Sequence, residues 1–191
     1  MTDQSPHVDN KAQELPKTLP FRLRPKLEET GSYEELEGLL PLDRLYRGSQ
    51  LFELDGGITY KLNLTNTGGG VLLRGKAQAA GTSECARCLE EASFEVEGDV
   101  EGYYILDPSE EDLQQADDEI TAVAPDGVID LWAPITAAII FELPQVLLCK
   151  EDCAGLCPVC GTNLNVGSCD CAKKPNPDHP FAALQGFIVE N

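Results

Sequence analysis

Eight cysteines carry the most specific chemical signal in this 191-residue chain. They form four close pairs, which are Cys85 and Cys88, Cys149 and Cys153, Cys157 and Cys160, and Cys169 and Cys171. Two thiolates at such a spacing can point at one ion, and four thiolates around one ion are typical of a structural zinc site. The sequence therefore predicts two zinc ions of a structural kind, each held by four sulfur atoms.

The spacing allows two divisions of the cysteines between these ions. We favour one local site, closed by a loop of only eight residues, made of Cys157, Cys160, Cys169 and Cys171. The second site would then be Cys85, Cys88, Cys149 and Cys153. The alternative places residues 149, 153, 157 and 160 on one ion and the two outer pairs on the other. Three further alternatives receive less weight: an iron–sulfur cluster, a redox dithiol at Cys85 and Cys88, and cysteines that are only buried small side chains.

No catalytic constellation accompanies the cysteines. The two histidines, His7 and His179, lie in polar or proline-rich surroundings and do not resemble a positioned base. The run Gly68–Gly70 is better explained as a turn than as a phosphate-binding loop. A zinc ion with four thiolate ligands has no open position for water. We therefore expect a protein that is not an enzyme and has no small-molecule substrate.

The N-terminal residues and the apolar segments predict a cytoplasmic protein. The first six residues contain neither the basic nor the apolar region of a secretory signal. The longest apolar stretch, residues 131–141, contains Pro134 and is far shorter than the roughly 20 residues that span a membrane. We therefore expect no membrane contact, and a reducing compartment in which cysteines bind metal more often than they form disulfides.

Alternating apolar and polar residues predict the strands that position the cysteines. Residues Ile58–Leu64 and Ala92–Tyr104 alternate as half-buried strands do, and Val71–Ala80 forms a further strand. In the strand Ala92–Tyr104, one face is strongly anionic, and its acidic residues are Glu95, Glu97, Asp99 and Glu101. The Cys85–Cys88 pair then lies at the tip of a hairpin.

Two helices are expected beside these strands. Residues Glu28–Leu40 read as a short acidic helix that Pro41 stops. Residues Leu131–Glu142 read as an apolar helix with Asp130 as its N-cap. Its inward face would contain Ile135, Ile139 and Leu143. The fold class is thus α+β, a mainly antiparallel sheet with one or two packed helices and a cysteine-rich, zinc-ribbon-like C-terminal segment. The expected divisions are a flexible arm (1–20), an α+β domain (21–148) and a metal-binding tail (149–191).

The charge distribution limits the class of partner. The chain has 14 basic and 33 acidic residues and a formal net charge of −19. Residues 84–119 alone contain 14 acids and one base, and residues 108–119 read as an acidic loop. Such a surface repels a phosphate backbone and attracts basic partners. The other explanation of this acidity is that it only maintains solubility.

Several motifs together resemble the bacterial YceD family. They are Cys85-Ala-Arg-Cys88-Leu89 before an acidic strand, Ile129-Asp130-Leu131 before an apolar helix that ends in Leu143-Pro144, the cysteine-rich run 148–165, and the segments 174–177 and 180–184. The resemblance covers roughly residues 20–187. It implies a cytoplasmic factor needed for accumulation of 23S ribosomal RNA, with metal binding suspected and no established catalysis.

Charge and resemblance together lead to one favoured hypothesis and one alternative. We favour a factor whose acidic strand face, at Glu95, Glu97, Asp99 and Glu101, holds a basic ribosomal protein or a precursor of the large subunit. In the alternative, the zinc ribbon and the basic residues of the segment 11–26 bind rRNA directly. An enzyme acting on rRNA is the least favoured class.

Overall fold

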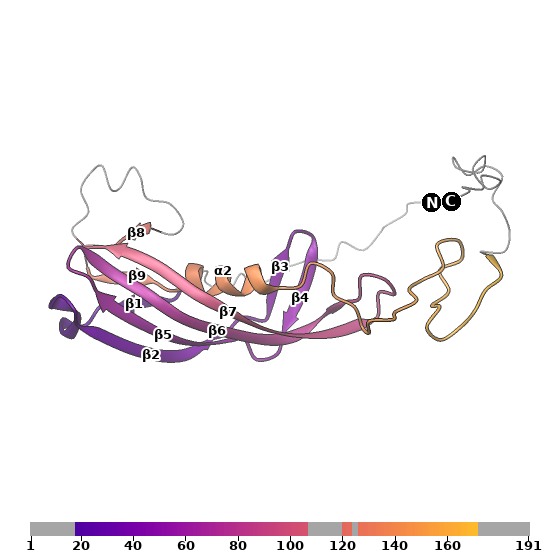
Figure 1. Ribbon diagram of the computed structural model, residues 1–191, viewed down its shortest axis with the longest axis horizontal. Coiled ribbons are helices and arrows are strands. Elements are labelled where there is room, and N and C mark those ends of the chain that lie inside the picture. Colours follow the sequence, from indigo (N-terminus) through magenta and orange to yellow (C-terminus); the bar gives the residue numbers. More distant parts are fainter. Residues whose placement is uncertain (1–17, 107–119, 124–125, 172–191) are drawn as a thin grey trace, which may run out of the picture. The chain divides into compact units, whose positions relative to one another are not determined.

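The structure, a computed structural model, describes residues 18–106, 120–123 and 126–171 (Figure 1). Most of the expected N-terminal arm, the acidic loop at 108–119 and both histidines lie outside these residues. No helix in the described part of the chain is long and apolar enough to cross a membrane.

The chain forms two compact units, and β6 and β7 contribute to both. Unit 1 contains the chain up to Thr82 together with Phe94–Pro144. Unit 2 contains the hairpin tip Ser83–Ser93 together with the chain from Gln145 onward. The division expected from the sequence includes the hairpin tip in the α+β domain (21–148). The structure groups it with the C-terminal segment, because hydrogen bonds and cysteine pairs join these two pieces.

Unit 1 is a mostly antiparallel sheet with one α-helix among the described residues. Long strands run in the order β2-β5-β6, β7 pairs with β6, and the short β4 and β3 continue from β6 (Figure 1). The strands are β2 (Tyr33–Leu40), β3 (Arg44–Arg47), β4 (Gln50–Leu54), β5 (Ile58–Asn66), β6 (Gly70–Glu84), β7 (Glu91–Ile105) and β8 (Ile120–Ala122). β8 pairs with the end of β7 in parallel. A separate two-stranded sheet joins β1 (Pro20–Arg22) to β9 (Val128–Asp130).

The core lies between one face of the sheet and helix α2 (Trp132–Glu142). The predicted inward residues of this helix, Ile135, Ile139 and Leu143, are all buried. Gly98 of β7 lets the helix come close, since a Cβ there would collide with the carbonyl oxygen of Ala138. The even-numbered residues of β7 face this side, so the predicted alternation is confirmed.

The start of α2 differs from the expectation by one residue. Leu131, not Asp130, is the N-cap. The Asp130 carboxylate still accepts a hydrogen bond from the Trp132 backbone N–H at 2.9 Å. It also accepts one from the Leu19 N–H at 2.7 Å, so the same side chain fixes the incoming β1 segment.

The predicted acidic helix over Glu28–Leu40 is wrong. A short 3-10 helix, η1 (Pro25–Glu28), precedes β2, which pairs antiparallel with β5 from Tyr33 opposite Thr65 to Leu40 opposite Ile58. Glutamate and leucine favour helices only weakly, and pairing with a neighbouring strand overrides that preference. The burial of β2 alternates with a period of two, as a strand requires.

Candidate metal centres

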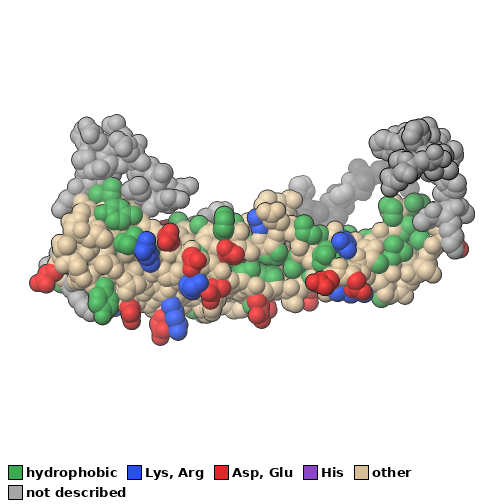
Figure 2. Space-filling model, viewed as in Figure 1, with side chains coloured by type: hydrophobic (Ala, Val, Ile, Leu, Met, Phe, Trp, Pro, Cys, Tyr) green, Lys and Arg blue, Asp and Glu red, His purple; other side chains and the backbone are tan. Residues whose placement is uncertain are grey.

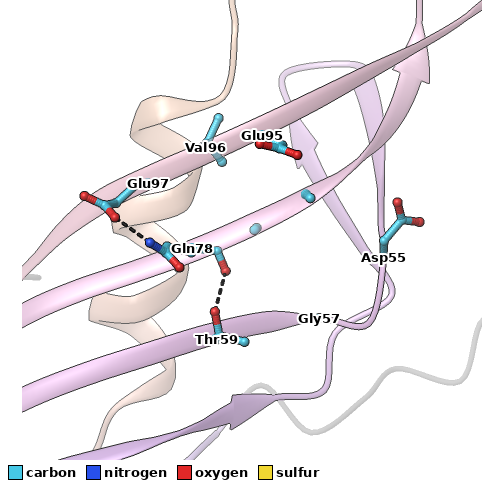
Figure 3. Close-up of a pocket in the computed structure, with 9 residues that line it drawn as sticks. Asp55, Gly57, Thr59, Gln78, Glu95, Val96 and Glu97 are labelled. Carbon is cyan, nitrogen blue, oxygen red and sulfur yellow. Dashed lines mark hydrogen bonds between the residues drawn. The ribbon is translucent and has the colours of Figure 1, made fainter.

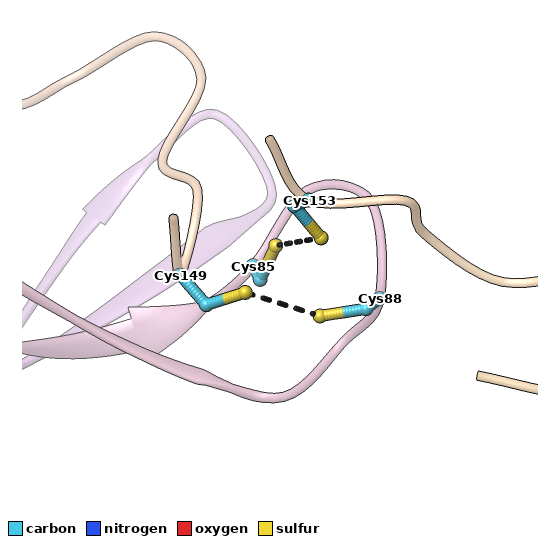
Figure 4. A group of neighbouring side chains, drawn as sticks. All are labelled: Cys85, Cys88, Cys149 and Cys153. Carbon is cyan, nitrogen blue, oxygen red and sulfur yellow. Dashed lines mark hydrogen bonds between the residues drawn. The ribbon is translucent and has the colours of Figure 1, made fainter. Parts of the chain in front are cut away.

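The first cysteine cluster joins the hairpin tip to the chain beyond α2. Cys85 and Cys88 come from the turn between β6 and β7, and Cys149 and Cys153 come from the C-terminal segment (Figure 4). All four sulfur atoms lie within 4.8 Å of one another. The Sγ atoms of Cys85 and Cys153 are 3.8 Å apart, and those of Cys88 and Cys149 are 3.5 Å apart. A tetrahedron with zinc–sulfur bonds of about 2.3 Å has edges of about 3.8 Å, so this cluster fits a zinc ion.

Hydrogen bonds of the backbone shape this cluster before any ion is considered. The Arg87 N–H points at Cys85 Sγ at 3.5 Å, and the Leu89 N–H donates to the Cys85 carbonyl at 3.0 Å. The Arg87 guanidinium donates to the Cys153 carbonyl at 2.9 Å, and the Leu156 N–H donates to the Arg87 carbonyl at 3.0 Å. These bonds connect the hairpin to the C-terminal segment directly.

The second cluster is local in sequence. The Sγ atoms of Cys157, Cys160, Cys169 and Cys171 also lie within 4.8 Å of one another. The Val159 N–H points at Cys157 Sγ at 3.5 Å, and the Gly161 N–H donates to the Cys157 carbonyl at 2.9 Å. These two bonds repeat those of the first cluster at equivalent positions. Both clusters therefore begin with the same kind of knuckle.

The two clusters differ in exposure. In the first, Cys85, Cys88 and Cys153 are buried, and only Cys149 is exposed. In the second, only Cys157 is buried, and the other three cysteines are exposed or half-buried. Solvent therefore reaches the second cluster more easily.

Each cluster contains thiols that ionise readily beside thiols that do not. Burial opposes ionisation of Cys85, but hydrogen bonds led by that of the Arg87 backbone lower its pKa from 9.0 to about 6. The pKa of Cys149 is raised to about 12, first by its contact with the Cys88 thiol and then by burial.

The second cluster repeats this division. The Thr162 hydroxyl and backbone N–H lower the pKa of Cys160 to about 6, whereas contact with Cys160 and burial raise that of Cys171 to about 12. Thiolates this close repel one another, and a divalent cation would remove that repulsion. The donor chemistry of both clusters thus suits a metal ion.

The structure contains the grouping of cysteines that the spacing favoured. The alternative grouping, with residues 149, 153, 157 and 160 together, does not occur in the described part of the chain. Sequence reasoning missed Asn165, whose side-chain amide donates to Cys153 Sγ at 3.3 Å. It also missed the positive φ of Leu89, at 62°. No sequence pattern indicates either role, because the Asn165 hydrogen bond and the Leu89 backbone conformation both depend on the geometry of the folded turns.

The predicted acidic face of β7 exists, but it is not purely acidic. Glu95, Glu97, Asp99 and Glu101 are all exposed on one side of the strand. The Lys76 ammonium on β6 lies 2.8 Å from the Glu97 carboxylate and 3.0 Å from that of Asp99. Hydrogen bonding to Lys76 lowers the pKa of Glu97. Basic side chains of β6 therefore lie beside the acids of β7. Acidic and basic side chains are interspersed on the face of the molecule that Figure 2 shows.

The same face of the sheet is hollowed. One hollow of ≈ 490 Å³ is lined by residues of β5, β6 and β7 and includes Glu95 and Glu97 (Figure 3). A second hollow of ≈ 750 Å³ extends toward β2 and shares Thr59, Gln78 and Glu97 with the first. Gln78 donates to Glu97 at 2.5 Å within the shared region. Two of the four predicted partner-binding acids thus line a concave surface.

Comparison with known proteins identifies the family. The family described as large ribosomal RNA subunit accumulation protein YceD matches residues 73–188. Uncharacterized proteins of Mycobacterium bovis and Mycobacterium tuberculosis are 36% identical over 119 residues, which is 61% of this chain and 57% of theirs. An uncharacterized protein of Mycobacterium leprae is 30% identical over 161 residues, which cover 84% of this chain and 70% of the length of that protein. No solved structure matches significantly.

The match to the family spans more than half of this chain and includes both cysteine clusters. The chain belongs to the YceD family.

Proposed function

We propose that this protein supports accumulation of 23S rRNA and assembly of the large ribosomal subunit without catalysing a reaction, by holding a basic ribosomal protein on its acidic surface. The family description, which names accumulation of the large ribosomal RNA, is the observation that carries the ribosomal part of this proposal. The hollowed acidic face of β7 supports the choice of a basic partner.

Two structural zinc ions are part of the proposal. Each cysteine cluster offers four sulfur donors and, among the described residues, no further candidate ligand, which matches a closed site without a position for substrate. When bound, zinc would supply structural cross-linking and not hydrolysis. The first ion would thereby join Cys85 and Cys88 to Cys149 and Cys153. The second ion would close the loop between the Cys157–Cys160 pair and the Cys169–Cys171 pair.

The charges of unit 2 favour a protein partner over RNA. Its described residues carry two bases and six acids, which are Arg87 and Lys150 against Glu84, Glu90, Glu91, Glu151, Asp152 and Asp170. Both bases are engaged, Arg87 with the Cys153 carbonyl and Lys150 with Asp152 at 3.7 Å. Two zinc ions with four thiolates each would add a charge of about −2 per site. A phosphate backbone would gain few contacts there.

The alternative of direct RNA binding relied on the basic N-terminal segment. Arg22 and Arg24 are the arginines of that segment, and both are paired. Arg22 lies 3.7 Å from Asp126, and Arg24 lies 2.8 Å from the buried Glu34. Their charges are therefore partly compensated within unit 1.

Charge reversal distinguishes the two candidates. Glu95→Lys changes an acid that has no ion pair among the described residues. We expect this variant to lose co-purifying basic ribosomal proteins after nuclease treatment, as measured by quantitative mass spectrometry, while its zinc content is unchanged. Glu35→Lys is the matched control, because it makes the same charge change at an exposed position of β2. Tighter binding of rRNA by Glu95→Lys, with full complementation of a deletion strain, would contradict the proposal.

A further inference from the structure

We propose that the free edge of β7 takes up an extended, basic protein segment as an additional β-strand. This inference rests on the proposed function, since it specifies how the basic partner is held. Addition of a strand to an open edge supplies main-chain hydrogen bonds for affinity and side-chain contacts for selectivity.

The described structure leaves most of the outer edge of β7 unpaired. β7 pairs with β6 along one side, and on the other side β8 covers only Tyr103–Ile105. Figure 1 shows β7 at the border of the sheet, with β6, β5 and β2 following in order. The segment Glu95–Glu101, which we call the β7 edge, has no backbone partner on that side among the described residues.

Hydrogen bonds near the end of β7 show which residues point their backbone groups outward. The Leu106 N–H donates to the carbonyl of Gly69, the residue that precedes β6, at 3.1 Å. The Val123 N–H, on the β8 side, donates to the Ile105 carbonyl at 3.0 Å. In an antiparallel pair, a residue directs both its N–H and its C=O to the same neighbour, and successive residues alternate. Even-numbered residues of β7 therefore face β6, and odd-numbered residues face the open edge.

Side-chain contacts indicate that this alternation continues along the β7 edge. Lys76 of β6 reaches Asp99, and Arg74 reaches Glu101 at 3.7 Å, so each step of two along β6 matches a step of two along β7. Gly69 and Leu106 follow the same register. The ladder therefore carries no extra residue between the β7 edge and its end. Within the part of the chain that the structure describes, Glu95, Glu97, Asp99 and Glu101 are the residues whose backbone groups are open to a partner.

The same four residues project acidic side chains on the exposed face of the sheet. The opposite face, formed by even-numbered residues, packs toward α2, as the close approach of Gly98 to Ala138 shows. A strand added to the β7 edge would place the side chains opposite these acids on the exposed face. Lysine or arginine at every second position would complement them.

Charge selects the occupant. A second copy of β7 would bring carboxylates opposite carboxylates, which destabilises a strand pair. Lys76 and Arg74 compensate part of the acidity, and four acids against these two bases leave an excess negative charge on the β7 edge. An extended segment of about seven residues with alternating basic side chains fits both the length and the charge of this edge.

A synthetic peptide in which five lysines alternate with four threonines tests this inference on the full chain. At low salt, we expect binding by fluorescence anisotropy, and we expect amide exchange of Glu95, Glu97 and Asp99 to slow at least tenfold in NMR. Amides of the even-numbered residues should change little, because they already bond to β6. In a control peptide, the backbone nitrogen of each lysine is methylated. This peptide retains its charge but lacks the main-chain N–H donors that strand addition requires, and we expect it to bind at least tenfold more weakly.

A pair of variants provides the second measurement. Glu95→Pro removes the charge and an N–H that points away from β6, and an edge strand tolerates proline at such a position. Glu95→Gln removes the same charge and keeps the N–H. We expect the proline variant to bind the peptide at least fivefold more weakly than the glutamine variant. If the proline variant does not fold, the exchange pattern of the unaltered chain decides.

The outcomes separate this inference from the proposed function. Equal binding of both peptides without protection of odd-numbered amides would overturn strand addition and leave the acidic surface as the binding element. Absence of binding by either peptide would overturn both. Protection that extends to β2 and not to β7 would place the added strand on the wrong edge and would also overturn the inference.

Discussion

The two cysteine knuckles have the same backbone frame and different surroundings. In each, the third residue points its N–H at the first cysteine sulfur, and the fifth residue donates to the carbonyl of the first cysteine. The fifth residue has a positive φ in both, 62° at Leu89 and 72° at Gly161. Both cysteines of the first knuckle are buried and meet a segment about sixty residues away, whereas the second knuckle has one exposed cysteine, Cys160, and meets its own neighbours.

This difference separates two tasks of a four-cysteine site. The first cluster holds together pieces of unit 2 that are remote in sequence, so a metal there would contribute to the folding of the whole unit. The second cluster closes a short loop and would order only that loop. The loss in chain entropy on closing a loop grows with its length, so the first closure opposes folding more strongly. We therefore expect loss of one cysteine ligand to disturb folding more in the first cluster than in the second.

The largest effect is expected from removing one ligand in each cluster. Cys85→Ser should lower zinc from two equivalents to one or fewer and unfold unit 2, because structural zinc sites provide on the order of 10 kcal/mol of folding free energy. Cys157→Ser should lower zinc by about one equivalent and leave the first cluster and the sheet of unit 1 folded. Elemental analysis and backbone NMR measure both effects. Complete loss of metal in Cys157→Ser would show that the clusters are coupled.

Chelation should reveal the difference in exposure. A chelator in excess should remove zinc in two phases, and the faster phase should belong to the second cluster, where three of the four cysteines are accessible. We expect the Cys157→Ser variant to show only the slower phase. A single phase in the unaltered protein, with equal rates for both ions, would contradict the assignment of unequal accessibility.

Protons should compete with zinc for the thiolates of both clusters, so the zinc affinity of each cluster should rise with pH. In the metal-free protein, the lowered pKa values of Cys85 and Cys160, about 6, and the raised values of Cys149 and Cys171, about 12, leave each cluster partly protonated between pH 6 and 12. Ligation requires thiolates, so each zinc ion must release at least one proton in that window. The affinity should therefore rise at least about tenfold per pH unit above pH 6.

Calorimetry in buffers of different ionisation enthalpy counts the protons released. The depressed pKa of Cys85 also stabilises the metal-free fold above the ordinary thiol pKa of 9.0, and this contribution is lost as the pH falls through about 6. Zinc affinity that does not change between pH 6 and 8 would contradict the prediction.

Sequence reasoning worked where a local pattern determines the structure. Alternation predicted the buried and exposed faces of β7, and pair spacing favoured the cysteine grouping that the structure contains. It failed for β2, whose glutamates and leucines suit a helix until β5 is available as a neighbour. It also overestimated the acidity of β7, because the positions of Arg74 and Lys76 beside the acids depend on strand register, which no single segment specifies.

The smallest expected effect concerns the residue in which the knuckles differ most simply. Leu89 adopts the left-handed conformation that Gly161 adopts in the second knuckle, and for residues other than glycine this costs about 1–2 kcal/mol. Leu89 is 60% exposed, so replacing it with glycine loses little apolar burial.

Leu89→Gly should therefore stabilise unit 2 by about 0.5–1 kcal/mol, since the greater freedom of glycine in the unfolded chain offsets part of the relieved strain. Gly161→Ala is the matched reverse change and should destabilise its loop by about 1 kcal/mol. Chemical denaturation of the zinc-loaded variants, followed by signals from unit 2, measures both. A Leu89→Gly variant that is clearly less stable than the unaltered protein would show that the exposed leucine contributes packing to unit 2 that outweighs its backbone strain.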